Sequence, residues 1–191
     1  MKNTLLILYG PSGSGKTSAT RLLAAKYGIP EIISITSRPQ RKGEVNGKDY
    51  FFVSYDRAAE MLGAGELIEH TIYDGHIYGI WEKELDNKVL SNKVSCVVTD
   101  LTGARQLMEL YPDNTKLIHL GAKIDILYNR ILERKQSLES VENRMKTVEK
   151  ELSQWVYADL VVNTGSMPVE KVADTIYEFA TKEPLVPDIV A

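Results

Sequence analysis

TLLILYGPSGSGKT, residues 4–17, is the stretch of sequence that decides the fold of this chain. Residues 4–9 are a continuous apolar run, which is typical of a strand buried on both faces of a sheet. Residues 10–17 match the phosphate-binding pattern G-x-x-x-x-G-K-[ST]. A helix is predicted over residues 16–27, because Ala, Leu and Lys recur there at helical spacing before Gly28 and Pro30. The order strand, phosphate loop, helix is the context that this pattern requires.

The residue types of the phosphate loop suit a nucleoside triphosphate. Glycines let the backbone turn so that successive N–H groups point at one anion, and the helix N-terminus adds its positive end. Lys16 is expected to neutralise the β- and γ-phosphates, and the hydroxyl of Thr17 to be a ligand of Mg²⁺. A Gly/Ser-rich turn that arose by chance is the alternative, and the flanking strand and helix count against it. The predicted ATP-binding residues of the loop are Ser12, Gly13, Ser14, Gly15, Lys16, Thr17 and Ser18.

Beyond the loop, apolar strands alternate with helices along the chain. This alternation predicts an α/β fold: a P-loop NTPase core with a central, mostly parallel sheet covered by helices on both faces. Residues 31–80 are richer in strands, with Asp74-Gly75 as a hairpin turn, and indicate an inserted mixed β region. The patterns predict strands at 94–99, 116–120 and 159–163, and helices at 55–62, 81–90, 103–111, 125–157 (with a break near 136–140) and 169–181.

Composition narrows the classes of function. The chain has 191 residues, with 23 Lys+Arg against 26 Asp+Glu and a formal net charge of −3. Its length suits one domain, and its slight acidity makes it a poor candidate for nucleic-acid binding. No stretch approaches the ~20 apolar residues of a membrane span. A single cysteine, Cys96, excludes an internal disulfide, so we expect a reducing, cytoplasmic location.

A second anion site is indicated in the loop SITSRPQRKGEVNGKDY, residues 34–50. Arg38 and Arg41 offer planar guanidinium groups, which match phosphate oxygens better than lysine does. Tyr50 and Tyr78 can each add a hydroxyl donor. A solvated basic loop is the alternative, since runs of charge usually face water. A second phosphate site beside a phosphate loop is, however, what a kinase of phosphorylated acceptors requires.

The run SITSRPQRKGEVNGKDYFFVS, residues 34–54, resembles the acceptor-binding segment of guanylate kinases. The resemblance continues in collinear order through residues 66–69, 73–75, 78–79, 100–103 and 162–163. It implies transfer of the γ-phosphoryl group of ATP to GMP, and also to dGMP, which gives ADP and GDP and serves purine nucleotide metabolism. It further implies Mg²⁺ as the cofactor of ATP, and a monomer or a homodimer.

The resemblance also assigns the acceptor site. It implies that Arg38, Arg41, Tyr50 and Tyr78 hold the GMP phosphate, and that Ser34, Glu69 and Asp100 recognise the guanine edge. The chemistry agrees, because guanine presents N1–H and N2–H₂ donors side by side and one carboxylate accepts both. Adenine has no such pair, so a buried carboxylate facing it is left unpaired. The predicted GMP-binding residues are Ser34, Arg38, Arg41, Tyr50, Glu69, Tyr78, Gly79 and Asp100.

Arg130, Arg134 and Arg144 lie in two predicted helical stretches, residues 125–156, which the resemblance identifies as a lid. These arginines, together with Lys16 and Arg41, are then the predicted catalytic residues, because guanidinium groups offset the charge of the transferred phosphoryl. Exposed amphipathic helices with salt bridges are the alternative. Asn163 is expected beside the adenine of ATP. One domain, 1–191, then comprises a core (1–33, 81–124 and 157–182), an acceptor-binding region (34–80) and the lid (125–156).

Three positions depart from the family's pattern. Ile80 stands where the family usually has Ser or Thr, Val98 replaces the first Asp of an Asp-x-Asp strand end, and Thr164 replaces a frequent Asp. Ile80 and Val98 leave open a kinase of a different nucleoside monophosphate. A catalytically weak guanylate kinase-like binding module is the other alternative, although such modules commonly lose the phosphate loop that is intact here.

Overall fold

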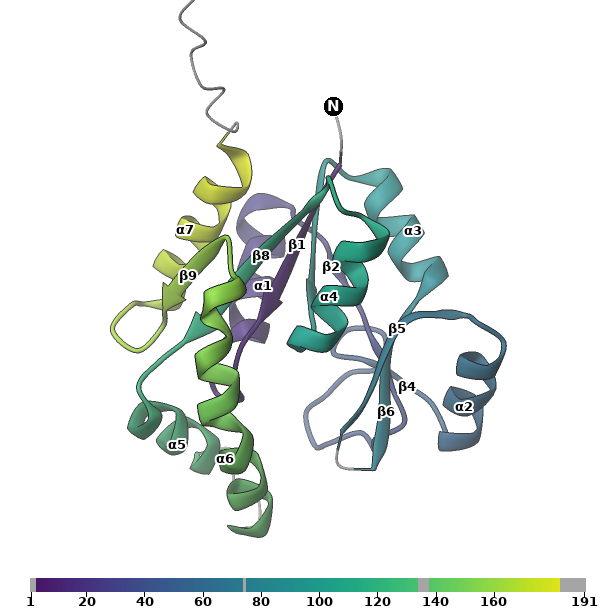
Figure 1. Cartoon of the computed structure of the whole chain (residues 1–191), viewed down its shortest axis with the longest axis horizontal. Coiled ribbons are helices and arrows are strands. Elements are labelled where there is room, and N and C mark those ends of the chain that lie inside the picture. Colours follow the sequence, from purple (N-terminus) through teal and green to yellow (C-terminus); the bar gives the residue numbers. More distant parts are fainter. Residues whose placement is uncertain (1–2, 74, 134–137, 183–191) are drawn as a thin grey trace, which may run out of the picture.

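The computed structural model describes residues 3–73, 75–133 and 138–182, without the side chains of 138–140, 143 and 144. Its centre is a five-stranded sheet in the order β2-β7-β1-β8-β9, in which every neighbouring pair is parallel. The predicted α/β fold with a central parallel sheet is therefore confirmed (Figure 1). The strands are β1 (Thr4–Tyr9), β2 (Glu31–Ile32), β7 (Val94–Val98), β8 (Thr115–Gly121) and β9 (Leu160–Asn163).

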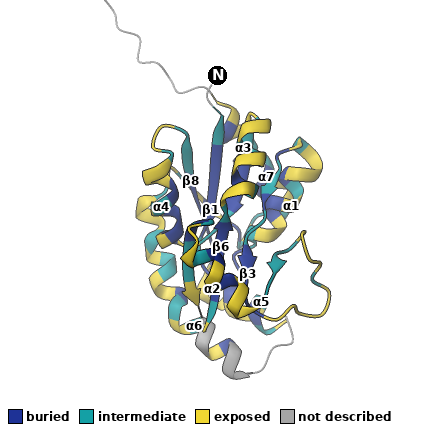
Figure 2. Ribbon diagram, turned by 90° about the vertical axis from the view of Figure 1, so that its right-hand side faces the viewer, coloured by how far each residue is buried: buried dark blue, intermediate teal, exposed yellow. Residues whose placement is uncertain are grey.

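Helices cover both faces of this sheet, as the apolar run of β1 predicts. Alternate residues of a strand point to opposite faces. Leu6 and Leu8 pack in one cluster with residues of α1 (Lys16–Tyr27) and α7 (Val169–Thr181). The intervening residues of β1 pack in a second cluster with α3 (Glu82–Ser91) and α4 (Leu101–Leu110). Figure 2 shows the buried strands between helices whose outer faces are exposed.

A second, smaller sheet corresponds to the predicted acceptor-binding region, and we call it the acceptor sheet. Its order is β4-β3-β6-β5, with β3 and β4 parallel and the other pairs antiparallel. Its core packs against α2 (Tyr55–Gly63), which begins where the Ser54 hydroxyl accepts the backbone N–H of Arg57 at 3.1 Å. The strands are β3 (Ile35–Thr36), β4 (Phe51–Phe52), β5 (Leu67–Tyr73) and β6 (His76–Trp81).

The third part comprises α5 (Ile124–Leu132), α6 (Leu138–Ser153) and the short 3₁₀ helix η1 (Gln154–Tyr157). Leu127 of α5 and Val148 of α6 are fully buried against each other and Ala122. In Figure 1 α5 and α6 lie at the lower left of the molecule, and the acceptor sheet lies at the lower right. Arg134, one of the predicted lid arginines, lies outside the described residues.

Local backbone chemistry explains why the phosphate loop has its shape. Gly10 has φ 131°, and a Cβ there would overlap the carbonyl oxygen of Leu120, so no other residue fits. The predicted helix over residues 16–27 is confirmed, with Gly15 and Gly28 in left-handed conformations at its two ends.

The helix predicted from residue 103 begins two residues earlier, at Leu101. The reason is that the carboxylate of Asp100 accepts the backbone N–H of Gly103 at 2.9 Å and so caps the helix.

Candidate active site

The phosphate loop connects the carboxyl end of β1 to the N-terminus of α1, so the predicted residues 12–18 come together at one edge of the central sheet. The Nζ of Lys16 donates to the carbonyl oxygens of Gly10 at 2.6 Å and Pro11 at 2.9 Å. Thr17 and Ser18 are exposed on the first turn of α1. The loop therefore presents an ammonium group, a helix N-terminus and hydroxyl groups at one place, which is an anion site.

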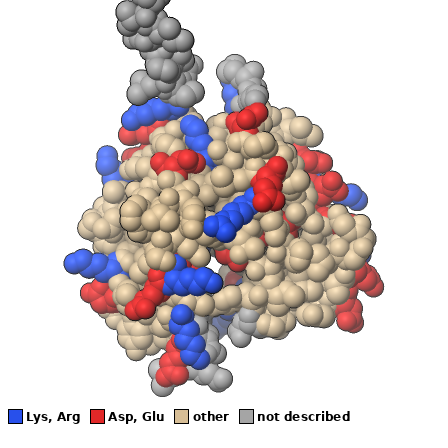
Figure 3. Space-filling view, viewed as in Figure 1, with Lys and Arg blue, Asp and Glu red and all other residues tan. Residues whose placement is uncertain are grey.

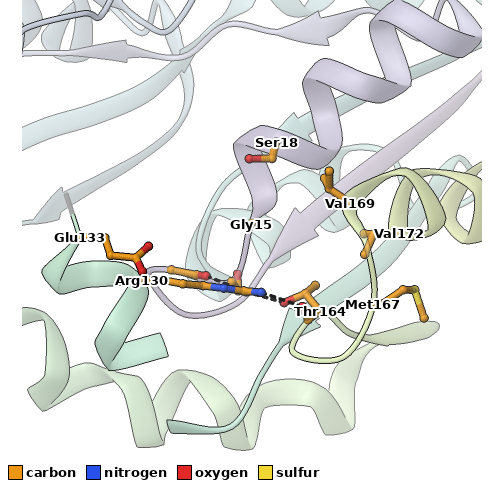
Figure 4. A pocket seen from close by; sticks show the side chains of 10 residues that line it. Gly15, Ser18, Arg130, Glu133, Thr164, Met167, Val169 and Val172 are labelled. Carbon is orange, nitrogen blue, oxygen red and sulfur yellow. Dashed lines mark hydrogen bonds between the residues drawn. The ribbon is translucent and has the colours of Figure 1, made fainter. Parts of the chain in front are cut away.

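A cavity of about 400 Å³ opens beside the loop, and we call it the donor cavity. One side is apolar, with Met167, Val169 and Val172 from the β9–α7 connection and α7 (Figure 4). The opposite side carries the guanidinium of Arg130. An apolar surface facing a planar cation suits a flat, polar ring. The cavity is lined by Gly13, Ser14, Gly15, Ser18, Arg130, Glu133, Thr164, Met167, Val169 and Val172.

Arg130 extends from α5 to the β9–α7 connection, as Figure 4 shows. Its guanidinium donates to the Thr164 carbonyl oxygen at 2.8 Å, to the Thr164 hydroxyl at 3.2 Å and to the Gly13 carbonyl oxygen at 3.3 Å. These bonds fasten the predicted lid to the phosphate loop. They also give a role to Thr164, which is 4% exposed and stands where the family often has Asp. Asn163, the last residue of β9, is exposed, and its Oδ1 accepts the Gly165 N–H at 3.0 Å.

The second anion site is built around Arg38, which is only 8% exposed. Its guanidinium lies over the rings of Tyr50 and Phe52, with the central carbon 5.7 and 5.6 Å from the ring centroids. It donates to Glu44 Oε1 at 2.8 Å, and Glu44 Oε2 accepts the backbone N–H of Arg41 at 2.7 Å. Glu44 therefore holds both arginine positions in one geometry. No motif in the sequence indicates this role of Glu44.

Two tyrosines complete this arginine site. The ring centroids of Tyr50 and Tyr78 lie 5.9 Å apart, edge to face, and both rings are half-buried. Burial raises the pKa of Tyr50, so its hydroxyl stays protonated and remains a donor. Arg38, Tyr50 and Tyr78 thus lie together as predicted, while the side chain of Arg41 lies in the exposed part of the loop.

A buried carboxylate lies between the two sheets at Glu69 of β5, which is 3% exposed. Its Oε1 accepts the hydroxyl of Thr99 at 3.0 Å. Burial, reinforced by the negative charge of Asp100 and opposed by the Thr99 bond, raises the pKa of Glu69 to about 7. A Cβ on Gly103 would overlap this carboxylate, which explains the glycine on the facing turn of α4. The side chain is poised to accept hydrogen bonds from a ligand.

The other predicted base-recognition residues surround Glu69. Asp100 follows the carboxyl end of β7, is exposed, and commits one carboxylate oxygen to the N–H of Gly103. Ser34 is half-buried, and its carbonyl oxygen accepts the Phe51 N–H at 2.9 Å. Gly79 of β6 is buried, and a Cβ there would come within 2.9 Å of the Glu69 carbonyl oxygen.

Two departures from the family's pattern are packing positions. Ile80 pairs across the β5–β6 ladder with Glu69, is fully buried, and belongs to the apolar cluster under α3 and α4. Val98, at the end of β7, packs against the cluster under α1 and α7. Apolar side chains at these two positions therefore contribute to the core beside the site.

Glu151 of α6 is a half-buried carboxylate that no motif in the sequence indicates. Burial raises its pKa, and the positive charge of Lys16 in the phosphate loop opposes that shift. The sequence offers one signal for Glu151, its position in the helix. It lies three residues after the buried Val148, and so on the inward side of an amphipathic helix. Arg144 belongs to the same helix, but its side chain lies outside the described residues.

A phosphate loop with a donor cavity, together with a separate arginine and carboxylate site, defines the class: a P-loop phosphotransferase with two nucleotide sites. A sequence model described as "Guanylate kinase" matches residues 2–181. The chain therefore belongs to the guanylate kinase family. Among the described residues, no helix combines the length and apolar character needed to cross a bilayer.

Individual relatives agree with this assignment. The chain is 35% identical over 156 residues to the guanylate kinase of Nostoc sp. (strain PCC 7120), which covers 80% of this chain and 77% of that protein. It is 36% identical over 166 residues to the guanylate kinase of Coxiella burnetii, covering 85% and 80%. The crystal structure of guanylate kinase from Anaplasma phagocytophilum superposes with a TM-score of 0.74 at 28% identity, covering 93% of this chain and 84% of that one.

Proposed function

We propose that this protein transfers the γ-phosphoryl group of ATP to GMP, giving ADP and GDP, and that it also accepts dGMP. The observation that carries the proposal is Glu69, a buried carboxylate beside the arginine site of a chain with an intact phosphate loop. Family membership supports the same reaction.

The proposed donor site comprises the loop residues 12–18, with Asn163 beside the adenine of ATP. Lys16 offsets charge on the β- and γ-phosphates. The exposed hydroxyl of Thr17 and the free carboxylate oxygen of Asp100 are hard oxygen donors, which suit Mg²⁺ or its bound water. When bound with ATP, Mg²⁺ neutralises phosphate charge. The protein's own groups hold the donor in position.

The proposed acceptor site divides the recognition of GMP into two parts. Arg38, Arg41, Tyr50 and Tyr78 bind the phosphate, and Glu69, with Ser34 and Asp100, binds the guanine edge. The Glu69 carboxylate accepts the N1–H and N2–H₂ donors, which stabilises its ionised form. No strong general base is needed, because the acceptor phosphate is already anionic. Alignment of two bound nucleotides and charge stabilisation supply the catalysis.

The two alternative functions are not favoured. Ile80 and Val98 pack in the core, so they do not by themselves indicate a different acceptor. The phosphate loop keeps its lysine and its backbone geometry, whereas a binding module that no longer binds ATP commonly loses them.

We further propose that residues 34–80 and the lid, residues 125–156, move during turnover. Arg134 and Arg144 then join Arg130 at the transferred phosphoryl group. We also propose a cytoplasmic location, which a single buried cysteine, Cys96, suits, and a monomeric or homodimeric state.

The proposal is tested by a coupled assay of ADP formation with ATP, Mg²⁺ and GMP. We expect turnover by the parent chain and its loss in Lys16→Ala. Arg41→Met is expected to raise the KM for GMP and to leave the affinity for ATP nearly unchanged. Absence of ADP formation by the parent chain, with ATP binding also absent by calorimetry, would instead favour the binding module.

A further inference from the structure

One hydrogen bond joins the acceptor sheet to the central sheet at Glu69. Thr99, the residue after β7, donates its hydroxyl to Oε1 of Glu69, on β5, at 3.0 Å. The strand β5 has a bulge between Leu67 and Glu69, where its register with β6 shifts. Bulges beside a site commonly turn a side chain toward it. The hydroxyl of Thr99 therefore contacts the carboxylate that the proposed function assigns to guanine.

The first turn of α4 packs on the same two atoms. A Cβ on Gly103 would overlap both Glu69 Oε1 and Thr99 Oγ1, so only a glycine lets the helix approach them. Later in α4, Gln106 Oε1 accepts the backbone N–H of His70, which follows Glu69 on β5, at 3.4 Å, and this bond holds the helix beside the strand. One side of Oε1 is therefore enclosed by the protein, and Thr99 supplies the hydrogen-bond donor on that side.

The other oxygen of the carboxylate is left for a ligand. In the part of the chain that the structure describes, Oε2 of Glu69 accepts no hydrogen bond, while Oε1 accepts one from Thr99. Because each carboxylate oxygen has two lone pairs, Oε1 can accept a second donor beside the one that reaches Oε2. Guanine presents such a pair, N1–H and N2–H₂, whereas hypoxanthine presents N1–H alone. Two parallel bonds require the carboxylate to lie in the plane of the base, so its orientation matters more for guanine than for hypoxanthine.

We propose that Thr99 is a positioning residue for guanine: its hydroxyl fixes the plane of the Glu69 carboxylate, so that both oxygens accept the N1–H and N2–H₂ donors of GMP together. The terminal torsion of a glutamate is soft on its own, so a contact has to select one orientation. The inference rests on the proposed function, because it requires GMP at the acceptor site. It makes Thr99 a determinant of the preference for GMP over IMP.

The test is kcat/KM for GMP and for IMP, measured at saturating ATP and Mg²⁺ with the parent chain and with Thr99→Val. The pH is set to 8.5, above the pKa of about 7 that burial gives Glu69, so that the carboxylate is ionised. Valine keeps the branched shape of threonine but has no donor. We expect kcat/KM for GMP to fall by about tenfold, as for a lost hydrogen bond to a charged group, and that for IMP to fall much less. Thr99→Ser should restore the GMP/IMP ratio of the parent chain.

The matched control is Thr102→Val, which removes a hydroxyl from an exposed position in the first turn of α4 and should keep the parent ratio. A parent ratio in Thr99→Val, including equal losses for GMP and IMP, would show a purely structural residue and overturn the inference, while the proposed function stands. A low ratio in Thr99→Ser would overturn it as well. If Thr99→Val does not fold, Thr99→Ala must lower the ratio, and an unchanged ratio counts equally against the inference. A parent chain that turns over no GMP refutes the proposed function, and the inference with it.

Discussion

Glu69 illustrates how a single side chain links recognition to stability. The folded protein keeps its carboxyl buried, with a pKa raised to about 7 mainly by burial. A carboxyl with a raised pKa binds its proton more tightly in the folded state than in the unfolded state. Folding stability therefore decreases as pH rises from the ordinary value of a glutamate toward 7, and the loss is complete above that. GMP offsets this cost by donating hydrogen bonds to the ionised form.

The first prediction concerns Glu69→Gln in the absence of nucleotide. At pH 8 the variant should be more stable than the parent by about 1–3 kcal/mol, because it has no carboxylate to ionise in the buried site. At pH 4.5 the two should differ much less. Urea unfolding at both pH values measures the difference, with the exposed Glu109→Gln as control. Parallel pH profiles for parent and Glu69→Gln would contradict the assigned burial and pKa.

The second prediction concerns Arg38→Lys. Lysine keeps the charge but loses the planar contact with Tyr50 and Phe52 and the guanidinium hydrogen bonds to Glu44 and to the Pro39 carbonyl oxygen. We expect the KM for GMP to rise by about tenfold or more, as for a lost charged hydrogen bond. Initial rates at saturating ATP measure this, and the KM for ATP should not change. Equal increases in both constants would show a general disturbance of the fold.

At the scale of residues, the sequence predicted members of the site only where a motif or the family resemblance identified them. Lys16 and Thr17 follow from the loop pattern, and Arg38 and Glu69 from the likeness to guanylate kinases. Glu44 was missed because its role depends on a tertiary contact with Arg38. A lone glutamate on a polar loop or an amphipathic helix has no sequence signature of such a contact.

Elements with local start and stop signals were predicted closely. The helix at residues 16–27 and the helix at 169–181 have the predicted bounds, the first between two glycines in left-handed conformations. The strands β2, β3 and β4 have two residues each, too few for any periodicity, and their pairing is decided by partners distant in sequence. The mixed sheet was therefore predicted as a region, without its strand order.

The β9–α7 connection supplies the third prediction, for Thr164→Val. The substitution removes the hydroxyl that accepts from Arg130 and donates to the Gly121 carbonyl oxygen at 3.3 Å. Arg130 then keeps only carbonyl acceptors, so we expect the KM for ATP to rise by about threefold to tenfold and the KM for GMP to stay unchanged. Steady-state kinetics measure both constants. Thr164→Ser should restore the parent value, and a failure of that rescue would separate Thr164 from the hold on Arg130.

At the scale of the whole molecule, a net charge of −3 conceals the organisation of the charges. The space-filling view shows a hollow between the lid helices and the acceptor sheet, with basic side chains on the lid side (Figure 3). Arg21 of α1 also forms an ion pair with Asp49 of the acceptor loop, which links the core to the inserted region. The two sheets and the predicted lid helices lie around this hollow, an arrangement that suits a reaction between two bound nucleotides.

The central claim, a phosphoryl transfer that selects guanine, is tested most directly by kcat/KM for a panel of nucleoside monophosphates with ATP and Mg²⁺. GMP should exceed AMP by on the order of 10⁴-fold, because AMP leaves the buried Glu69 carboxylate without its donor pair. IMP, which keeps N1–H but lacks the 2-amino group, should fall between them. Turnover of AMP or CMP that equals or exceeds turnover of GMP would contradict the claim.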